Sequence, residues 1–235
     1  MNSTQQKKKN NYLYLVWNNP INHSNYIVGS LYKEDGYKFK YNNEFLNIVK
    51  EQGIELLHAF PDGEKEYYSK ELFPAFSSRL PDRKRRDIDK ILEKYGLSTF
   101  DEFELLKCGG GKLPIDTYEF VDPIFPAEET ISKNFYVMGV RYYNQCNGDD
   151  CECMEGINEG EELLLKCEPN NKHDKNAVQM IKGEKLIGYI PRYYSEAVSK
   201  RLNSGMSYKC TIIEVSKFNI CNECIKVNLL MPRND

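Results

Sequence analysis

Cationic and aromatic side chains gather in three short stretches of the second half of the chain. The cations could neutralise phosphates, and the flat rings could stack on nucleotide bases. Single-stranded nucleic acid needs this combination, because its bases are accessible and its backbone is charged. The candidate cations are Arg141, Lys175 and Arg192, and the candidate rings are those of Tyr142, Tyr143, His173 and Tyr189.

Some of the residues in these stretches have a structural alternative. Tyr142 and Tyr143 end an apolar-aromatic run over 135–143 that predicts a strand. Because successive side chains of a strand point to opposite faces, we expect one ring in the core and only the other available for stacking. Asp174 and Asn176 favour tight turns, in which their side chains cap nearby backbone groups.

Cysteines form a second constellation, whose spacing suits a metal. Three lie in one polar loop and two in the last connection of the chain. Two such groups of thiolates can enclose a tetrahedral zinc ion, which would order a loop too polar to order itself. Unligated surface thiols or a disulfide are the alternatives. The candidate zinc ligands are Cys146, Cys151, Cys153, Cys221 and Cys224, whereas Cys108, Cys167 and Cys210 have the apolar neighbours of core residues.

Two motifs in the first half suggest phosphate contacts but fit other interpretations better. The run Gly-Gly-Gly-Lys at 109–112 lacks the earlier glycine of a phosphate loop and has Leu113 where Ser or Thr should bind magnesium. We interpret it as a helix-to-strand connection. The basic run at 83–86 is flanked by Asp82 and Asp87, which is more typical of a solvated helix face than of a nucleic-acid patch.

The composition limits the classes of function. The chain has 235 residues, enough for two small domains, and a net charge of -3. Because the chain is not basic overall, any contact with nucleic acid must be local, on a few nucleotides. No apolar run approaches the roughly 20 residues that span a bilayer, and the polar N-terminus lacks the apolar segment of a signal peptide. We expect a cytoplasmic protein without membrane contact, whose cysteines favour metal binding over disulfides.

Alternation and turn residues predict a mixed, mainly β chain with a few helices. In the first half, helices are predicted from Asp82 to Tyr95 and, after a Ser98 cap, over 99–107. A further helix is predicted over 194–203. The predicted strands are 12–17, 28–32, 37–41, 116–121, 135–143, 162–168, 176–182, 185–190, 208–215 and 225–231.

The prolines at 123 and 126 mark the best domain boundary. Two prolines within four residues disfavour a helix and stiffen the chain. We therefore expect a disordered tail and two domains joined by a short linker. The expected ranges are 1–10 for the tail, 11–122 for an α+β first domain, 123–130 for the linker and 131–232 for a small β-barrel second domain.

Three signatures occur in order in the second domain. They are G-V-R-Y-Y at 139–143, E-P-N-N-K-H-D-K-N-A-V at 168–178 and I-G-Y-I-P-R at 187–192. Together they resemble the HIRAN domain, an OB-like β-barrel module that binds nucleic acid. The resemblance implies a groove that recognises the 3′ end of single-stranded DNA.

The resemblance also implies roles for single residues. Arg141 and Arg192 would bind phosphates, and Tyr142 would stack on a base. Asp174 would accept a hydrogen bond from the terminal 3′-hydroxyl, a donor that an internal nucleotide lacks. Arg192 could equally be a surface residue at the start of a helix.

Two positions depart from the family's pattern. His173 stands where the best-known eukaryotic relative has a stacking tyrosine, and an imidazole stacks more weakly. Tyr189 stands where that relative has a histidine, which would partly compensate. These exchanges affect the expected affinity and the preference for an end.

The first domain carries its own set of signatures. They are V-G-S-L-Y at 28–32 with F-K-Y at 39–41, F-P-A-F-S-S-R-L-P-D at 73–82 and F-E-L-L-K-C-G-G-G at 103–111. They resemble the N-terminal subdomain of HipA-type toxin kinases and its small stand-alone version in tripartite toxin–antitoxin operons. The sequence contains no kinase core, so the resemblance implies an interaction or regulatory module.

Three functions are consistent with these features. We expect a non-enzymatic DNA-binding protein that holds a single-stranded 3′ end and recruits a partner through its first domain. The alternative is an antitoxin-like regulator that contacts a HipA-like kinase or its DNA-binding antitoxin. An enzyme such as a nuclease fits least, because its chemistry needs clustered metal-binding carboxylates and the acidic residues are scattered. We expect no required cofactor, and the structural zinc considered above is the one candidate.

Overall fold

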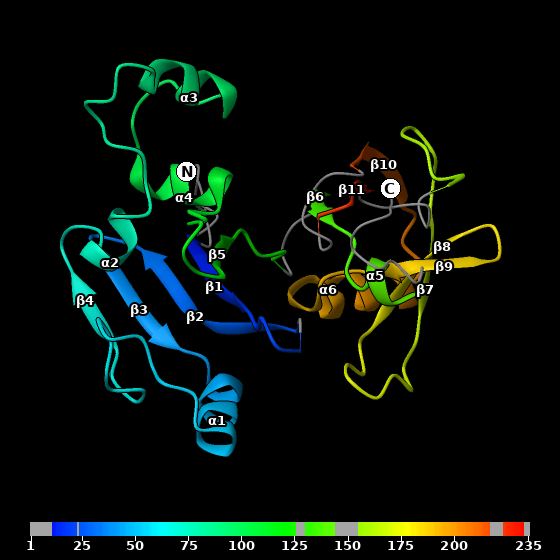
Figure 1. The fold of residues 1–235 in the computed structure, drawn as a ribbon, viewed down its shortest axis with the longest axis horizontal. Coiled ribbons are helices and arrows are strands. Elements are labelled where there is room, and N and C mark those ends of the chain that lie inside the picture. The colour runs from blue at the N-terminus through cyan, green and yellow to red at the C-terminus, as the bar shows by residue number, and fades with distance from the viewer. Residues whose placement is uncertain (1–10, 23, 126–129, 144–154, 217–222, 233–235) are drawn as a thin grey trace, which may run out of the picture. The chain divides into compact units, whose positions relative to one another are not determined.

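The computed structural model describes residues 11–22, 24–125, 130–143, 155–216 and 223–232. Within this part, the chain divides between Pro123 and Ile124 into two compact units (Figure 1). The expected tail lies outside the described residues. No described helix has the length and apolar character needed to cross a bilayer.

The first unit is a five-stranded antiparallel sheet with helices. The strand order is β4-β3-β2-β1-β5, which extends the predicted β2–β3 hairpin on both sides. Its strands are β1 (Tyr12–Asn18), β2 (Asn25–Lys33), β3 (Tyr37–Tyr41), β4 (Tyr67–Ser69) and β5 (Tyr118–Val121). Its helices are α1 (Asn43–Gln52), α2 (Pro74–Ser77), α3 (Ile88–Lys94) and α4 (Glu102–Gly109).

Aromatic side chains fill the core of this unit. The alternation in β3 buries Phe39 completely, and its ring centroid lies 4.6 Å from that of Phe60 and 5.3 Å from that of Phe76. Such ring pairs contribute about 0.5–1.5 kcal/mol beyond the apolar area that they bury.

A buried arginine joins the segment after α2 to the start of β5. The Arg79 side chain is 8% exposed and forms a bidentate pair with Asp116, with both N–O distances 2.7 Å. It also donates to the carbonyl oxygens of Gly111 at 2.7 Å and Tyr118 at 2.9 Å. Burial raises the pKa of the Asp116 carboxyl, but the hydrogen bonds from Arg79 and from the Tyr118 amide outweigh burial and lower it. The glycine run is therefore a helix-to-strand connection that receives Arg79.

Two predicted helix starts in the first unit are wrong. The helix expected from Asp82 begins at Ile88, because the Asp82 carboxylate accepts the Lys84 amide at 2.7 Å and forms a turn instead. The helix expected after Ser98 begins at Glu102, where Asp101 is the cap. The short edge strand β4 was not predicted.

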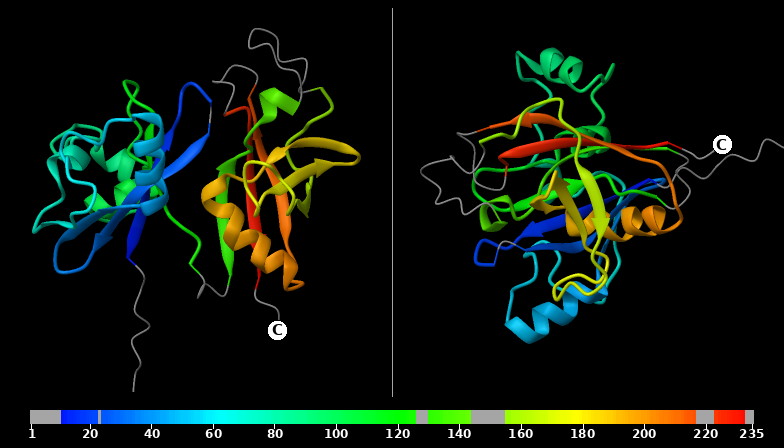
Figure 2. Two further views of the ribbon diagram at one scale, coloured as in Figure 1. Left: turned by 90° about the horizontal axis from the view of Figure 1, so that it is seen from below. Right: turned by 90° about the vertical axis from the view of Figure 1, so that its right-hand side faces the viewer.

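The second unit consists of two three-stranded antiparallel sheets. Their strand orders are β10-β11-β6 and β7-β8-β9. The predicted hairpin around residues 183–184 forms β8 and β9. The strands are β6 (Ile131–Tyr136), β7 (Leu164–Cys167), β8 (Val178–Lys182), β9 (Lys185–Tyr189), β10 (Lys209–Val215) and β11 (Ile225–Met231). The helices are α5 (Val140–Tyr143) and α6 (Arg192–Asn203), the latter packed on β7 and β8 (Figure 2).

The predicted barrel is formed only in part, because isolated bridges replace continuous pairing between the two sheets. On one side Met138 and Tyr189 exchange backbone hydrogen bonds of 2.9 and 2.8 Å. On the other side Glu162 pairs with Thr211. At the first of these seams Gly188 has no space for a side chain, since a Cβ atom there would lie 2.4 Å from the Met138 carbonyl oxygen.

Candidate nucleic-acid interface

The tyrosine pair lies on a helical turn and not on a strand. β6 ends at Tyr136, and Gly139 adopts a left-handed φ of 77° that leads into α5. Tyr142 is 80% exposed and Tyr143 38% exposed. The expectation of a strand over 135–143 with one ring buried is therefore wrong, because strand alternation does not apply on a helical turn.

Three tyrosine rings form a connected cluster, named here the tyrosine cluster (Tyr142, Tyr143 and Tyr189). The ring centroids of Tyr143 and Tyr189 are 5.3 Å apart, and those of Tyr142 and Tyr143 are 4.9 Å apart in an edge-to-face arrangement. The Met138–Tyr189 bridge fixes β9 beside the segment that leads into α5. Rings held in this way offer faces and edges on which unstacked bases can pack.

An acidic residue fixes the cluster to the neighbouring loop. The Tyr189 hydroxyl donates to Oε2 of Glu168 at 2.7 Å, and Nδ2 of Asn171 donates to the same oxygen at 2.8 Å. The bonds from Asn171 and Tyr189 lower the pKa of Glu168. Burial and the Glu168 carboxylate raise the pKa of Tyr189, which stays a neutral donor. Sequence reasoning missed Glu168, because an acid has no direct use in a site chosen for cations.

Asp174 organises the loop between β7 and β8. Its Oδ1 atom accepts the Asn176 amide at 2.8 Å, and its Oδ2 atom accepts the Ser195 hydroxyl of α6 at 2.6 Å. The Asn171 side chain accepts the amides of His173 and Asp174 at 2.9 and 3.2 Å. The turn alternative thus describes what Asp174 does here. Because each carboxylate oxygen has two lone pairs and accepts one of these bonds, each oxygen of Asp174 can accept one further donor.

The three predicted cations lie on three elements of this region and are exposed. Arg192 is the first residue of α6, two positions before the predicted start, and its side chain is exposed. Ser195, one turn later, connects this helix to Asp174. Lys175 and Arg141 are also exposed. The hydrogen bonds of Glu168 and Asp174 therefore link the tyrosine cluster, the loop and the start of α6, and each of these elements carries one predicted cation.

We expect Glu168→Ala to loosen the loop. The substitution removes the shared acceptor of Tyr189 and Asn171, and a hydrogen bond to a charged group contributes about 1.5–3 kcal/mol. Amide hydrogen exchange over residues 171–176 should become about tenfold faster. The matched control is Glu184→Ala in the exposed β8–β9 turn, which should leave that exchange unchanged. Equal exchange in both variants would contradict the role of Glu168.

The zinc prediction concerns residues that the structure does not describe. Cys146, Cys151, Cys153 and Cys221 lie outside the described ranges, and Cys224 is buried. Among the residues that are described, no group of three or more His, Cys, Asp or Glu side chains could hold a metal ion. The zinc site stays a prediction. Of the three expected core cysteines, Cys210 is buried, Cys167 is partly buried and Cys108 is exposed on α4, so the last expectation is wrong.

Family comparisons agree with both halves of the chain. Residues 132–228 match the family model of the HIRAN domain, and residues 21–114 match that of the HipA N-terminal domain. Both resemblances seen in the sequence are confirmed. A comparison with curated proteins finds no match.

Two solved structures are similar to part of the chain. One is the HIRAN domain of human HLTF, with 19% identity over 46% of this chain and 81% of that chain, and a TM-score of 0.33. The other is a protein from Lactobacillus plantarum, with 18% identity over 43% of this chain and 96% of that chain, and a TM-score of 0.34.

Proposed function

We propose that this chain, a HipA N-terminal-type domain followed by a HIRAN domain, is a cytoplasmic, non-enzymatic protein that binds the 3′ end of single-stranded DNA. The HIRAN domain would hold the DNA, and the first domain would contact a protein partner. The observation that carries the proposal is the tyrosine cluster, which lies next to a loop and a helix start that both carry cations.

Base stacking and phosphate neutralisation would be carried out by different residues. The Tyr142 ring is exposed enough to take a base on its face. Arg141, Lys175 and Arg192 would neutralise the backbone phosphates. Because the whole chain has a net charge of -3, affinity would come from these few contacts and not from a long basic surface.

Preference for an end would come from Asp174. A terminal 3′-hydroxyl can donate to a carboxylate oxygen that still has acceptor capacity. A 3′-phosphate would place a second negative charge against the same group, and so would an internal phosphodiester. His173 directly precedes Asp174 in the same turn and is exposed. Its ring would therefore lie near the terminal sugar that Asp174 binds.

The test compares labelled single strands that end in a 3′-hydroxyl or a 3′-phosphate. We expect the wild type to bind the hydroxyl end about tenfold more tightly. Asp174→Asn should reduce this preference to about twofold, because asparagine keeps the turn but lacks the charge. Asp89→Asn on exposed α3 is the matched control. Equal affinity of the wild type for both ends would refute the end preference, and absence of binding to either strand would refute DNA binding.

The HipA N-terminal match favours a second function, regulation of a HipA-type kinase through protein contacts. This function would need the first domain and would not need the tyrosine cluster. Inhibition of such a kinase by a variant that no longer binds DNA would therefore favour the second function over the first.

A further inference from the structure

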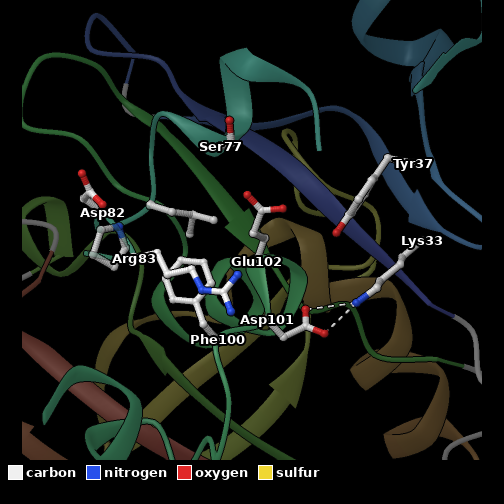
Figure 3. A pocket seen from close by; sticks show the side chains of 10 residues that line it. Lys33, Tyr37, Ser77, Asp82, Arg83, Phe100, Asp101 and Glu102 are labelled. Carbon is white, nitrogen blue, oxygen red and sulfur yellow. Dashed lines mark hydrogen bonds and ion pairs between the residues drawn. The ribbon is translucent and has the colours of Figure 1, made fainter. Parts of the chain in front are cut away.

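The first unit contains a pocket that DNA binding does not use. Its volume is about 600 Å³, within the range of ligand sites. The ends of β2 and α2 and the turn before α4 contribute its wall, with apolar surface from Leu80 and the ring of Phe100 (Figure 3).

One ion pair at this pocket is satisfied internally. The Lys33 ammonium lies 2.8 and 3.0 Å from the two carboxylate oxygens of Asp101. Asp101 also caps α4 by accepting the amides of Phe103 and Glu104 at 2.9 and 3.1 Å. Asp101 is therefore neutralised and occupied, and the first amides of α4 are not available to attract an anion.

The next residue has no such partner. The Glu102 carboxylate projects into the pocket between Arg83 and Tyr37 (Figure 3). It makes no hydrogen bond or ion pair with any residue that the structure describes. Burial and the negative charges of Asp101 and Glu71 raise the pKa of Glu102. The charges of Lys33 and Arg83 oppose this rise only in part. The pocket thus contains a partly buried carboxylate that has no direct ion-pair partner among the described residues.

The nearby arginine is directed elsewhere. The Arg83 guanidinium lies over the Phe100 ring, 5.7 Å from its centroid. The turn at Asp82 places it there. Arg83 forms no ion pair with Glu102 within the described residues, so its charge offsets that of the carboxylate only from a distance. A phosphate at Arg83 would face Asp82 and Glu102, which both repel it.

We propose that this pocket receives a lysine or arginine side chain of a partner protein, with Glu102 as its counter-ion. The aliphatic stem of such a side chain would pack on Leu80 and the Tyr37 ring, and its charged end would reach the carboxylate. The proposal rests on the proposed protein-contact role of the first domain, and it specifies the chemistry of that contact. Complementary charge of this kind selects partners more than it adds affinity.

The test uses the full-length, nitrogen-15-labelled protein and the peptide acetyl-Ala-Lys-Ala-amide. We expect saturable shifts in the backbone amides from Phe100 to Glu104. Glu102→Gln should weaken this binding at least about tenfold, because a charge-assisted hydrogen bond is lost. Glu51→Gln on exposed α1 is the matched control and should bind as the wild type does. The same peptide with an acetylated lysine should cause no saturable shift.

Three results would overturn the proposal. They are equal binding of the acetylated peptide, unchanged binding by Glu102→Gln, and saturation of the pocket by inorganic phosphate when the lysine peptide has no effect. Single-stranded DNA binding is measured on the same samples and should be identical for wild type and Glu102→Gln. If the peptide does not bind but DNA does, the pocket proposal is refuted and the DNA proposal is not. If the peptide binds but DNA does not, the DNA proposal is refuted and the pocket proposal is not.

Discussion

Replacing Tyr142 by alanine is expected to weaken binding of single-stranded DNA by at least about tenfold. Loss of one base-stacking ring costs about 1–3 kcal/mol in comparable sites. Tyr142 is 80% exposed, so its removal should change the free energy of unfolding by no more than about 0.5 kcal/mol. Fluorescence anisotropy with a labelled strand and urea unfolding of the same samples measure the two effects.

The control for this substitution is another exposed tyrosine. Tyr68, on β4 of the first unit, is 58% exposed and lies outside the proposed interface. Tyr68→Ala should bind DNA as the wild type does. If both variants bind normally, the tyrosine cluster is not the stacking surface, and the proposed function loses the observation on which it is based.

Replacing Arg79 by alanine is expected to destabilise the first domain by about 3–5 kcal/mol. The substitution leaves the Asp116 carboxylate and two carbonyl oxygens without their common donor, and breaking a buried ion pair has a cost of this size. Urea denaturation followed by tyrosine and tryptophan fluorescence measures it. Because the single tryptophan, Trp17, lies in β1 of this domain, its emission reports on the affected domain.

An exposed pair provides the control for this effect. Arg85 is paired with Asp87 at the surface, and such pairs contribute about 0–1 kcal/mol. Arg85→Ala should therefore be nearly neutral, and an equal effect of both substitutions would contradict the importance of burial. Acid provides a second measurement. Since the folded-state pKa of Asp116 is lowered, its stabilisation is complete above about pH 4 and is lost as the pH falls through the lowered value.

The elements that could be predicted are those whose signals are local. The β8–β9 hairpin has alternating residues on both sides of Gly183, which adopts the left-handed φ of 58° that favours glycine. The β2–β3 hairpin has the same kind of pattern. The predicted ends of β3, β8 and β9 lie within two residues of the observed ones, whereas β2 begins three residues earlier than predicted. In both hairpins the alternation of the strands and the glycine of the turn are local signals.

The failures arise where a distant contact decides between local options. Ser98 and Asp101 are both good cap residues, but Lys33 pairs with Asp101 and so favours the later start of α4. Similarly, the run before Tyr143 is suited to a strand until Gly139 turns it into α5. No local pattern distinguishes a glycine inside a strand from one that ends it.

The candidate site shows the same division. Motif order was sufficient to select the three stretches that form it. The hydrogen bond between Tyr189 and Glu168 joins positions 21 residues apart, and the bond between Asp174 and Ser195 does the same. These bonds determine how the rings and the loop are placed, and the identity of the residues alone does not reveal them.

The bridge between Met138 and Tyr189 determines what happens when the second domain unfolds locally. β9 is the outer strand of its sheet, and this bridge is the backbone pairing that joins it to the segment after β6. If the bridge opens, the edge of β9 is left unpaired at that point and can act as a template for pairing with other chains. The same opening releases Tyr189 from the segment that carries Tyr143. Loss of DNA binding and self-association would therefore both follow from the opening of this bridge. A change that stabilises the bridge would reduce both.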